Sequence, residues 1–362
     1  MQSGYNNRNI KINMATESLV PGLIIAESVM NSYGAVVAWQ DTELSTALIS
    51  GLAALGIKSV LVYKEDILVE NEQVQKDWLI EMKNDVFERK YENDKDHFKE
   101  LFLNISSGGT LTKDDTDPII KNILEVKKEN SLIVDSIMEI RAFDEYTYYH
   151  SLNVAMLAMM IGRWMRLSEP DIHELVRAGL LHDIGKGLVQ NSILNKPGSL
   201  LPHEMVEMKR HSEYGYQLVK KIREIPDKVA VAVLTHHERD DGSGYPLKLR
   251  ADKLTGIAKI LAIADVFDAM TSNRVYRSHE PVFNVFDLMQ NRSFGQLDPI
   301  VLEIFLKNIT HYYIGKRVRL TNGKIGDIVF MNNHHFSRPV VNLDNEFIDL
   351  MLDKTVKIDD LA

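Results

Sequence analysis

Residues 181–186 read LHDIGK and follow an amphipathic segment over Asp171–Leu180, so the sequence predicts a helix leading into this motif. Adjacent His182 and Asp183 project about 100° apart on a helix, so they converge on neighbouring ions only where a second helix faces them. Borderline divalent metals accept imidazole nitrogen as well as carboxylate oxygen, and an aspartate has two oxygens with which to bridge two ions. The motif therefore predicts helices that meet around a metal site.

Other histidines and aspartates extend this prediction. Seven of the twelve histidines in the chain lie between His150 and His237. Asp265 lies within an apolar helical run, where a buried carboxylate is costly unless it is paired or bound to a metal. Each residue alone would also suit a core histidine or a helix cap, but together they accompany several apolar helical runs. The residues that share this feature are His150, His182, Asp183, His211, His236, His237 and Asp265.

Patterns along the rest of the chain predict a mainly α fold with small flanking modules. The segment Leu44–Leu55 has helical spacing before Gly56, and Ile57–Tyr63 is strand-like, which indicates a small α+β N-terminal module over residues 1–64. Residues 65–142 read as a helical linker, with a second helix expected over Pro118–Ala142 behind an Asp117 N-cap. Helical periodicity dominates residues 143–311, where we expect the helical domain that contains the candidate metal ligands. Asn322-Gly323 between apolar runs is a hairpin signal, so residues 312–362 form a small β appendage.

The same positions carry a resemblance to a known family. Residues 143–310 resemble the HD-GYP domain, a subgroup of the HD phosphohydrolases that hydrolyses cyclic di-GMP. The matching segments are His150-Ser151 with Val154, His182-Asp183 with Gly185-Lys186, Lys196-Pro197-Gly198, His211 with Gly215, His236-His237-Glu238-Arg239, Asp241–Pro246, Asp265–Thr271, Arg274, Tyr276, Arg277 and Leu297-Asp298-Pro299.

The resemblance implies a centre of two divalent metal ions. By position, His150, His182 and Asp265 would bind one ion, and Asp183 would bridge it to the other. The second ion would be bound by His211, His236 and His237. Mixed imidazole and carboxylate ligation suits Fe or Mn better than Mg or Ca, and Ni or Zn can replace them during purification.

The resemblance also implies a reaction. A metal-bridged hydroxide would attack phosphorus and open cyclic di-GMP to linear pGpG, with GMP as a further product. Asp183 and Lys186 would be the catalytic residues. The expected substrate contacts are Lys186, Arg274, Arg277 and Tyr245, although the two arginines would also suit surface salt bridges. Two alternatives stay open: a non-catalytic module that senses cyclic dinucleotides or a protein partner, and a phosphohydrolase for another nucleotide such as cyclic GMP-AMP.

The expected number of ions depends on which residue lies one helical turn before His150. Some members of the family hold a third ion with a glutamate at the i−4 position, which here is Tyr146, whereas Glu145 is at i−5. Five helical steps turn Glu145 about 140° away from His150. We therefore expect two ions, unless the helix begins after Thr147 and leaves Glu145 in a loop. With two ions, linear pGpG would accumulate.

Composition limits the remaining possibilities. The chain has 362 residues, no cysteine and a formal net charge of −9. Without cysteine there is no disulfide, thiol nucleophile or iron–sulfur ligand, and the acidic balance disfavours non-specific DNA binding. The polar start and the interrupted apolar run near Leu152–Met165 predict a cytoplasmic protein without a membrane contact. The Asp241–Pro246 loop is a candidate contact for a signalling partner, and a homodimer is also considered.

Overall fold

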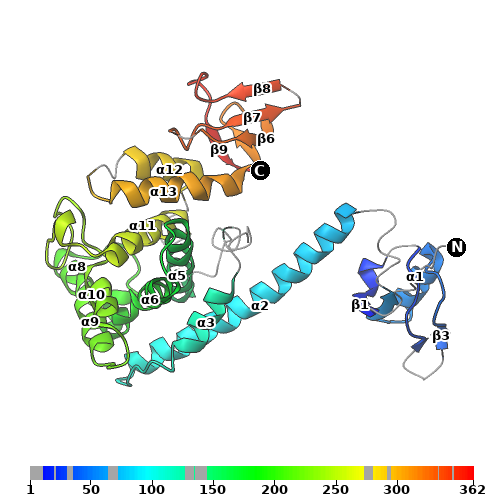
Figure 1. Cartoon of the computed structure of the whole chain (residues 1–362), viewed down its shortest axis with the longest axis horizontal. Helices are drawn as coiled ribbons and strands as arrows, with labels where there is room; N and C mark the ends of the chain where they lie inside the picture. Colours follow the sequence, from blue (N-terminus) through cyan, green and yellow to red (C-terminus); the bar gives the residue numbers. More distant parts are fainter. Residues whose placement is uncertain are drawn as a thin grey trace. The chain divides into compact units, whose positions relative to one another are not determined.

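The computed structural model describes residues 11–19, 22–30, 36–63, 72–126, 134, 145–272, 280–291, 295–332, 334–344 and 346–362, with the backbone alone at 46–47 and 72–86. These residues divide into two compact units, Met1–Val86 and Phe87–Ala362 (Figure 1). The division falls inside helix α2 (Glu72–Ser106), so one continuous helix belongs to both units.

The first unit, which extends to Val86, contains strands and a helix over residues for which the sequence predicts an α+β module. Strand β1 (Lys11–Ala15) pairs antiparallel with β4 (Ser59–Tyr63), and β2 (Val29–Met30) pairs with β3 (Val36–Ala38). A 3₁₀ turn, η1 (Thr16–Ser18), follows β1. Helix α1 (Thr46–Ala54) begins where Ser45 accepts a hydrogen bond from the Leu48 amide, and it ends before Gly56, whose φ is +71°.

The linker region contains a shorter second helix than the sequence predicts. Helix α3 (Asp117–Glu125) buries Ile119, Ile120 and Ile123 and ends at Val126, whose backbone is extended. The expected continuation to Ala142 lies outside the described residues, apart from Val134. The N-cap is Thr116 rather than Asp117, because Asp117 enters the helix and accepts a hydrogen bond from buried Arg177.

The helical core of the second unit is formed by helices that contact one another around the candidate centre. Helix α5 (Tyr146–Trp164) packs on α6 (Glu169–Leu181) and α11 (Gly256–Thr271), as Figure 1 shows. Helix α9 (His211–Lys220) packs on α10 (Asp227–Thr235) and on the 3₁₀ segment η4 (Ile184–Leu188). The connecting segments contain α7 (Asn191–Leu194), α8 (Pro202–Lys209) and η5 (Ala251–Lys253).

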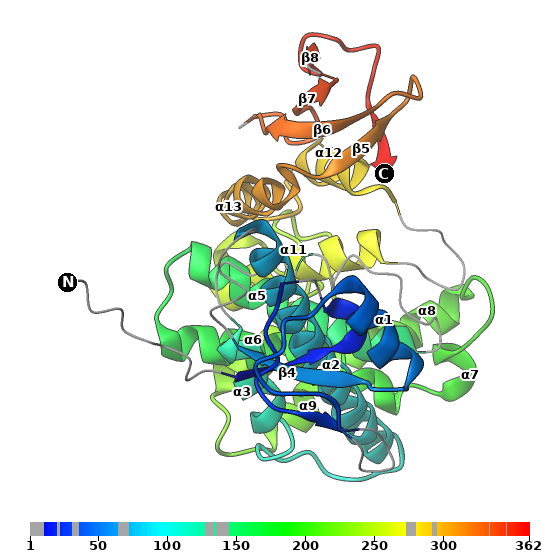
Figure 2. The ribbon, with the colours of Figure 1, turned by 90° about the vertical axis from the view of Figure 1, so that its right-hand side faces the viewer.

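The C-terminal sheet shares its core with these helices. Helices α12 (Val282–Asn291) and α13 (Pro299–Ile309) and the turn η6 (Thr310–Tyr313) precede the sheet, which lies beside α12 and α13 in Figure 2. Its five antiparallel strands, in the order β8-β7-β6-β5-β9, are β5 (Arg317–Leu320), β6 (Ile325–Phe330), β7 (Val340–Leu343), β8 (Glu346–Asp349) and β9 (Ile358–Leu361). Buried sheet residues such as Val318 and Ile328 join the same apolar cluster as the helices.

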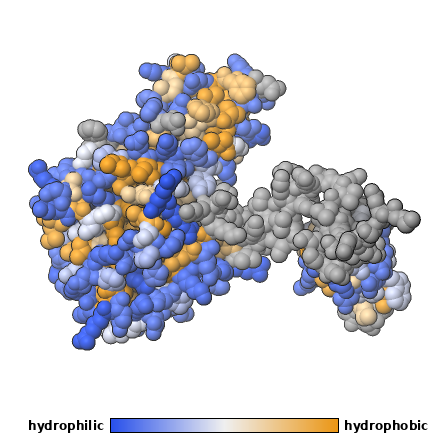
Figure 3. All heavy atoms as spheres, viewed as in Figure 1, coloured by the Kyte–Doolittle hydropathy of each residue, from blue (hydrophilic) through white to orange (hydrophobic). Residues whose placement is uncertain are grey.

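The observed fold confirms the predicted class, which is mainly α with small sheets toward both ends. The predicted hairpin at Asn322-Gly323 joins β5 to β6, and Gly323 has the positive φ that this turn requires. On the face of the second unit seen in Figure 3, hydrophilic residues surround smaller apolar areas. Within the described ranges, no helix has the length and apolar character needed to cross a bilayer.

Candidate metal centre

Five helices bring the predicted ligands together, and all of these ligands except Asp265 lie at or near helix ends. His150 lies in the second turn of α5, and His182 and Asp183 follow the last residue of α6 directly. His211 is the first residue of α9, and His236 and His237 follow the last residue of α10. Asp265 lies within α11, where most of its neighbours along the chain are apolar and buried. All seven predicted ligands therefore fall into two neighbouring groups, each with its ligand atoms within 4.8 Å of one another.

The first group is centred on the Nε2 atom of His150. This atom lies 3.2 Å from His182 Nε2 and 3.2 Å from Asp265 Oδ1. It also lies 3.5 Å from Asp183 Oδ2, which is itself 3.2 Å from His182 Nε2. Four potential ligand atoms, from helices α5 and α11 and from the end of α6, thus face a common point.

The second group uses the other oxygen of Asp183. His211 Nε2 lies 3.2 Å from Asp183 Oδ1 and 3.4 Å from His236 Nε2. His237 is directed toward the other oxygen of Asp265, with 3.5 Å between His237 Nδ1 and Asp265 Oδ2. Asp183 therefore lies between the groups, with Oδ2 facing His150 and His182 and Oδ1 facing His211.

Hydrogen bonds on the far side of the imidazole rings leave lone pairs directed into the centre. The Nδ1 atoms of His182, His211 and His236 lie 2.7, 2.8 and 2.7 Å from the backbone oxygens of Gly179, Met208 and Val233. A neutral ring that donates its Nδ1 proton to a carbonyl has only a lone pair at Nε2. These lone pairs would face one another and the carboxylates at close range, an arrangement that a cation between them stabilises.

The electrostatics of the carboxylates fit the same conclusion. Asp183 and Asp265 are buried, and Asp183 Oδ1 has no hydrogen-bond partner among the described residues. Burial favours a neutral Asp183, but Lys186 and His182 hold its pKa well below the ordinary value. An ionised, buried oxygen without a hydrogen-bond donor is the kind of group that metal coordination stabilises. The residues present therefore fit two divalent cations.

The surroundings of the histidines shift their pKa values in opposite directions. Burial lowers the pKa of His211 to about 4 and that of His236 to about 3, so both rings are neutral and able to bind metal. Burial also acts to lower the pKa of His150, but the carboxylates of Asp265 and Asp268 raise it to about 9. A cation beside His150, a proton or a metal, is thus strongly favoured.

The predicted substrate residues are only partly described. Lys186 Nζ lies 2.5 Å from Asp183 Oδ2, at the edge of the centre. The Tyr245 ring lies 4.6 Å from the His237 ring, and Lys209 Nζ lies 4.9 Å from the centre of the Tyr245 ring. Arg274 and Arg277 lie outside the described residues.

Glu145 is occupied elsewhere. Helix α5 begins at Tyr146, and Glu145 precedes it with its carboxylate 2.8 Å from Lys95 Nζ and 2.6 Å from Lys99 Nζ. The Tyr146 hydroxyl lies 3.4 Å from His150 Nδ1, on the opposite side of the ring from the metal-facing Nε2. Neither residue directs an oxygen toward the two groups of ligand atoms.

Two residues that sequence reasoning left without a role support the site. Buried Glu238 accepts hydrogen bonds from the Leu247 and Leu249 amides at 2.6 and 2.9 Å, so it anchors the loop that contains Tyr245. Buried Asp268 lies 2.6 Å from His150 Nδ1 through its Oδ2 atom. A second carboxylate three residues after Asp265, in the same apolar helix, was the signal available in the sequence.

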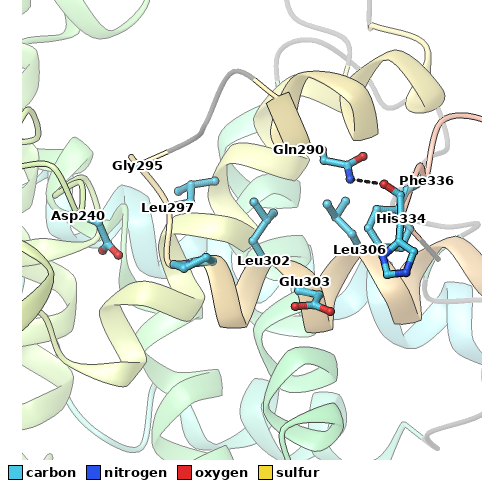
Figure 4. A pocket seen from close by; sticks show the side chains of 10 residues that line it. Asp240, Gln290, Gly295, Leu297, Leu302, Glu303, Leu306, His334 and Phe336 are labelled. Atoms are coloured by element: carbon cyan, nitrogen blue, oxygen red, sulfur yellow. Dashed lines mark hydrogen bonds between the residues drawn. The ribbon is translucent and has the colours of Figure 1, made fainter.

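A separate cavity lies away from the centre. It has a volume of about 450 Å³ and is lined by residues that include Asp240, Gln290, Leu302 and Phe336 (Figure 4). None of the seven ligand residues lines it. The metal centre is instead a closely packed cluster in which His237 is half-buried and the other six ligand residues are buried.

Comparison with known proteins points to the same part of the chain. The family model described as HD domain matches residues 118–301. The chain is 35% identical over 227 residues to the cyclic di-GMP phosphodiesterase PA4108 of Pseudomonas aeruginosa, which covers 63% of this chain and 54% of the relative. It is 38% identical over 176 residues to a cyclic di-GMP phosphodiesterase of Thermotoga maritima, which covers 48% of this chain and 47% of the relative.

A third relative acts on a different cyclic dinucleotide. The 3'3'-cGAMP-specific phosphodiesterase 3 of Vibrio cholerae is 36% identical over 154 residues, which covers 42% of this chain and 33% of the relative. The chain spans about half the length, or less, of these curated relatives.

Proposed function

The chain belongs to the HD domain family, and from that membership we propose that it is a metal-dependent phosphodiesterase that opens cyclic di-GMP to linear pGpG. The observation that carries the proposal is the position of Asp183, whose two oxygens face two different groups of ligand atoms. A carboxylate so placed suits a bridge between two cations. The similarity to two relatives named as cyclic di-GMP phosphodiesterases supports the choice of substrate.

In this proposal the seven residues hold two divalent ions. His150, His182 and Asp265 would bind one ion, His211, His236 and His237 the other, and Asp183 both. Two bound divalent ions supply a water of lowered pKa at neutral pH and positive charge beside the phosphodiester. Lys186 carries a further positive charge next to Asp183, where it is suited to bind a phosphate oxygen or to protonate the leaving oxygen.

The remaining substrate contacts are proposed from the chemistry of each side chain. The Tyr245 ring, partly buried beside His237, offers a flat surface for a guanine base. Arg274 and Arg277 would bind the second phosphate or a guanine edge by paired donors. The Asp241–Pro246 loop stays a proposed contact for a signalling partner, since Asp241 and Ser243 are exposed.

We propose Fe or Mn as the ions, with Ni or Zn as replacements acquired during purification. Five imidazoles and two carboxylates suit these metals better than Mg or Ca, which prefer all-oxygen sites. Elemental analysis of protein purified without added metal tests the assignment. Full occupancy by Mg or Ca alone would contradict it.

We also propose two ions rather than three, and pGpG as the product that accumulates. The pairing of Glu145 with Lys95 and Lys99 supports this count, because both lysines would have to be displaced before Glu145 could bind a metal. A metal-loaded structure provides the test. A third ion bound by Glu145 would refute the two-ion assignment.

The direct test of function is incubation of the purified protein with cyclic di-GMP and Mn²⁺ or Fe²⁺, followed by separation of the products. We expect pGpG to appear with metal and not with chelator. Binding of cyclic di-GMP without turnover under any metal would favour the alternative of a sensing module.

Cyclic GMP-AMP is the second candidate substrate, since one relative is named as specific for it. Both dinucleotides should be offered in one reaction, so that the ratio of their kcat/KM values is measured directly. A ratio in favour of cyclic GMP-AMP would reassign the substrate and leave the metal centre unchanged.

A further inference from the structure

A chain of buried hydrogen bonds runs from helix α2 to the ligand His150. The Tyr91 hydroxyl donates to Asn153 Oδ1 at 2.5 Å, and Asn153 Nδ2 donates to Asp268 Oδ1 at 2.7 Å. The other oxygen of Asp268 lies 2.6 Å from His150 Nδ1. All four residues are at most 3% exposed, and they come from helices α2, α5 and α11.

We propose that Tyr91 is a positioning residue for the metal centre, acting through Asn153 and Asp268 to hold His150 in its ligating orientation. The inference rests on the metal centre proposed above and deepens it. It makes the position of α2 a determinant of metal affinity, although no residue of α2 is among the seven proposed ligands.

The donor-to-acceptor direction of the hydrogen bonds supports this role. Asn153 accepts from Tyr91 with its oxygen, so its amide group points toward Asp268 and can only donate there. Asp268 Oδ2 can then accept from His150 Nδ1–H, so His150 Nε2, which faces the ligand group, is the ring atom available to a metal. Each bond determines the orientation of the next group.

His150 differs in this respect from three other proposed ligands. His182, His211 and His236 each bond through Nδ1 to a backbone oxygen three residues earlier, so their rings are oriented by their own local turns. The orientation of His150 instead depends on side chains from two other helices. One of them, Asp268, is 118 positions away in the sequence. A movement of α2 would therefore reach His150 while leaving those three rings in place.

Removal of the Tyr91 hydroxyl would leave Asn153 Oδ1 in a buried place without this donor. An unsatisfied buried polar atom is costly, and the amide could relieve the cost by rotating. Rotation would turn its oxygen toward Asp268 and weaken the support of His150. Loss of such an outer partner typically lowers metal affinity or activity about 10–100-fold.

Tyr91 lies in the part of α2 that belongs to the second unit, five residues beyond the division after Val86. The same helix continues into the first unit. Tyr91 thus links a proposed metal ligand to the element that joins the two units along the chain.

The test compares Tyr91→Phe with a matched control, Tyr149→Phe. Tyr149 also forms a hydroxyl hydrogen bond between α5 and α2, at 2.8 Å to Glu92 Oε2, and its ring lies 5.7 Å from that of Tyr91. Each variant loses one hydroxyl at the same helix interface, but only Tyr91 begins the chain to His150. The primary measurement is the Mn²⁺ dissociation constant of the metal-stripped 362-residue chain, with kcat and KM for cyclic di-GMP measured alongside.

We expect Tyr91→Phe to weaken Mn²⁺ binding by about 10-fold or more, and Tyr149→Phe by less than about 2-fold. In an Asn153→Ala background, Tyr91→Phe should have no further effect on Mn²⁺ affinity, because the chain is already broken. Unchanged affinity in Tyr91→Phe would refute the proposal. Equal losses in both tyrosine variants would refute it too, since they would reflect loosened packing of α2 on α5.

The same measurements separate this inference from the proposed function. A wild-type protein that binds no divalent transition metal would overturn both. A wild-type protein that binds Mn²⁺ but hydrolyses neither cyclic dinucleotide would overturn the proposed reaction alone, and the affinity difference between the two tyrosine variants would still test the role of Tyr91.

Discussion

Asp183 is the residue on which both groups of ligand atoms depend. We expect Asp183→Asn to lower both turnover and the amount of bound metal, because a neutral amide holds two cations poorly. Loss of a residue that only hydrogen-bonds to a metal ligand typically costs about 10–100-fold, and we expect the loss of turnover here to be larger. The fold should persist, since α6 ends before this residue. Turnover and metal content are the measurements, with exposed Asp252→Asn as the control. Near-normal activity in Asp183→Asn would mean that the site is wrongly assigned.

Asp94 provides a residue-scale test of stability that is independent of metal. Burial raises its pKa to about 6, against the lowering effects of Asn122, His97 and Lys90. The folded protein therefore binds a proton at Asp94 more tightly than the unfolded chain does. The free energy of unfolding consequently falls as pH rises from about 4 through 6.

Asp94→Asn removes the buried charge and should stabilise the protein at pH 8 by at most ~3 kcal/mol, the free energy that corresponds to a pKa raised from about 4 to about 6. At pH 4 the variant and the wild type should have similar stability. Chemical denaturation at both pH values is the measurement, with exposed Asp114→Asn as the control. An equal effect at both pH values would exclude a titrating carboxylate as the cause.

At the scale of elements, the centre depends on the close approach of η4 and α9. A Cβ added at Gly185 would overlap the backbone oxygen of His211 and the backbone nitrogen of Gly215. Backbone atoms cannot move aside as side chains do, so η4 would have to shift away from α9. Because Asp183 precedes η4 and His211 begins α9, the shift would separate two proposed ligands.

Gly185→Ala should therefore lower stability by about 1–3 kcal/mol and weaken metal binding as well. Gly187→Ala is the matched control in the same segment, since its added Cβ would come no closer than 3.1 Å, to the Ser106 side-chain oxygen. Thermal unfolding and Mn²⁺ titration distinguish the two variants. Equal behaviour would show that the contact of Gly185 with α9 does not position the ligands.

At the scale of the whole molecule, the described residues form two separate apolar clusters. One contains Met14, Ile25, Val62 and their neighbours in the first unit, and the other joins the helical core to the C-terminal sheet. A ligand stabilises only the unit that binds it, by about 2.7 kcal/mol at a concentration one hundred times the dissociation constant.

Calorimetry of the 362-residue chain should therefore show two unfolding transitions. Saturating Mn²⁺ should raise the midpoint of the transition of the second unit by about 5–10 °C and leave the other unchanged. Chelator should reverse the shift. A single transition, or two that move together, would show that the units unfold cooperatively.

Much of this protein follows from the sequence alone. Apolar periodicity and turn residues predicted the mainly α class, the α+β start and the β end. The adjacency of His and Asp to apolar helical runs identified all seven residues that converge in the structure. These features are local, because a helix or a hairpin turn is specified by residues within a few positions of one another. Even the ring orientation of His182 depends on a carbonyl in its own turn.

Other features were decided only by the tertiary structure. The bonds of Asp268 to His150, of Tyr91 to Asn153 and of Glu145 to Lys95 and Lys99 join residues that are 46 to 118 positions apart. No local pattern encodes such pairs, because they depend on the angles and distances at which helices pack. The end of α3 at Glu125 was missed for a related reason, since the helical pattern continues past the residue where the chain turns.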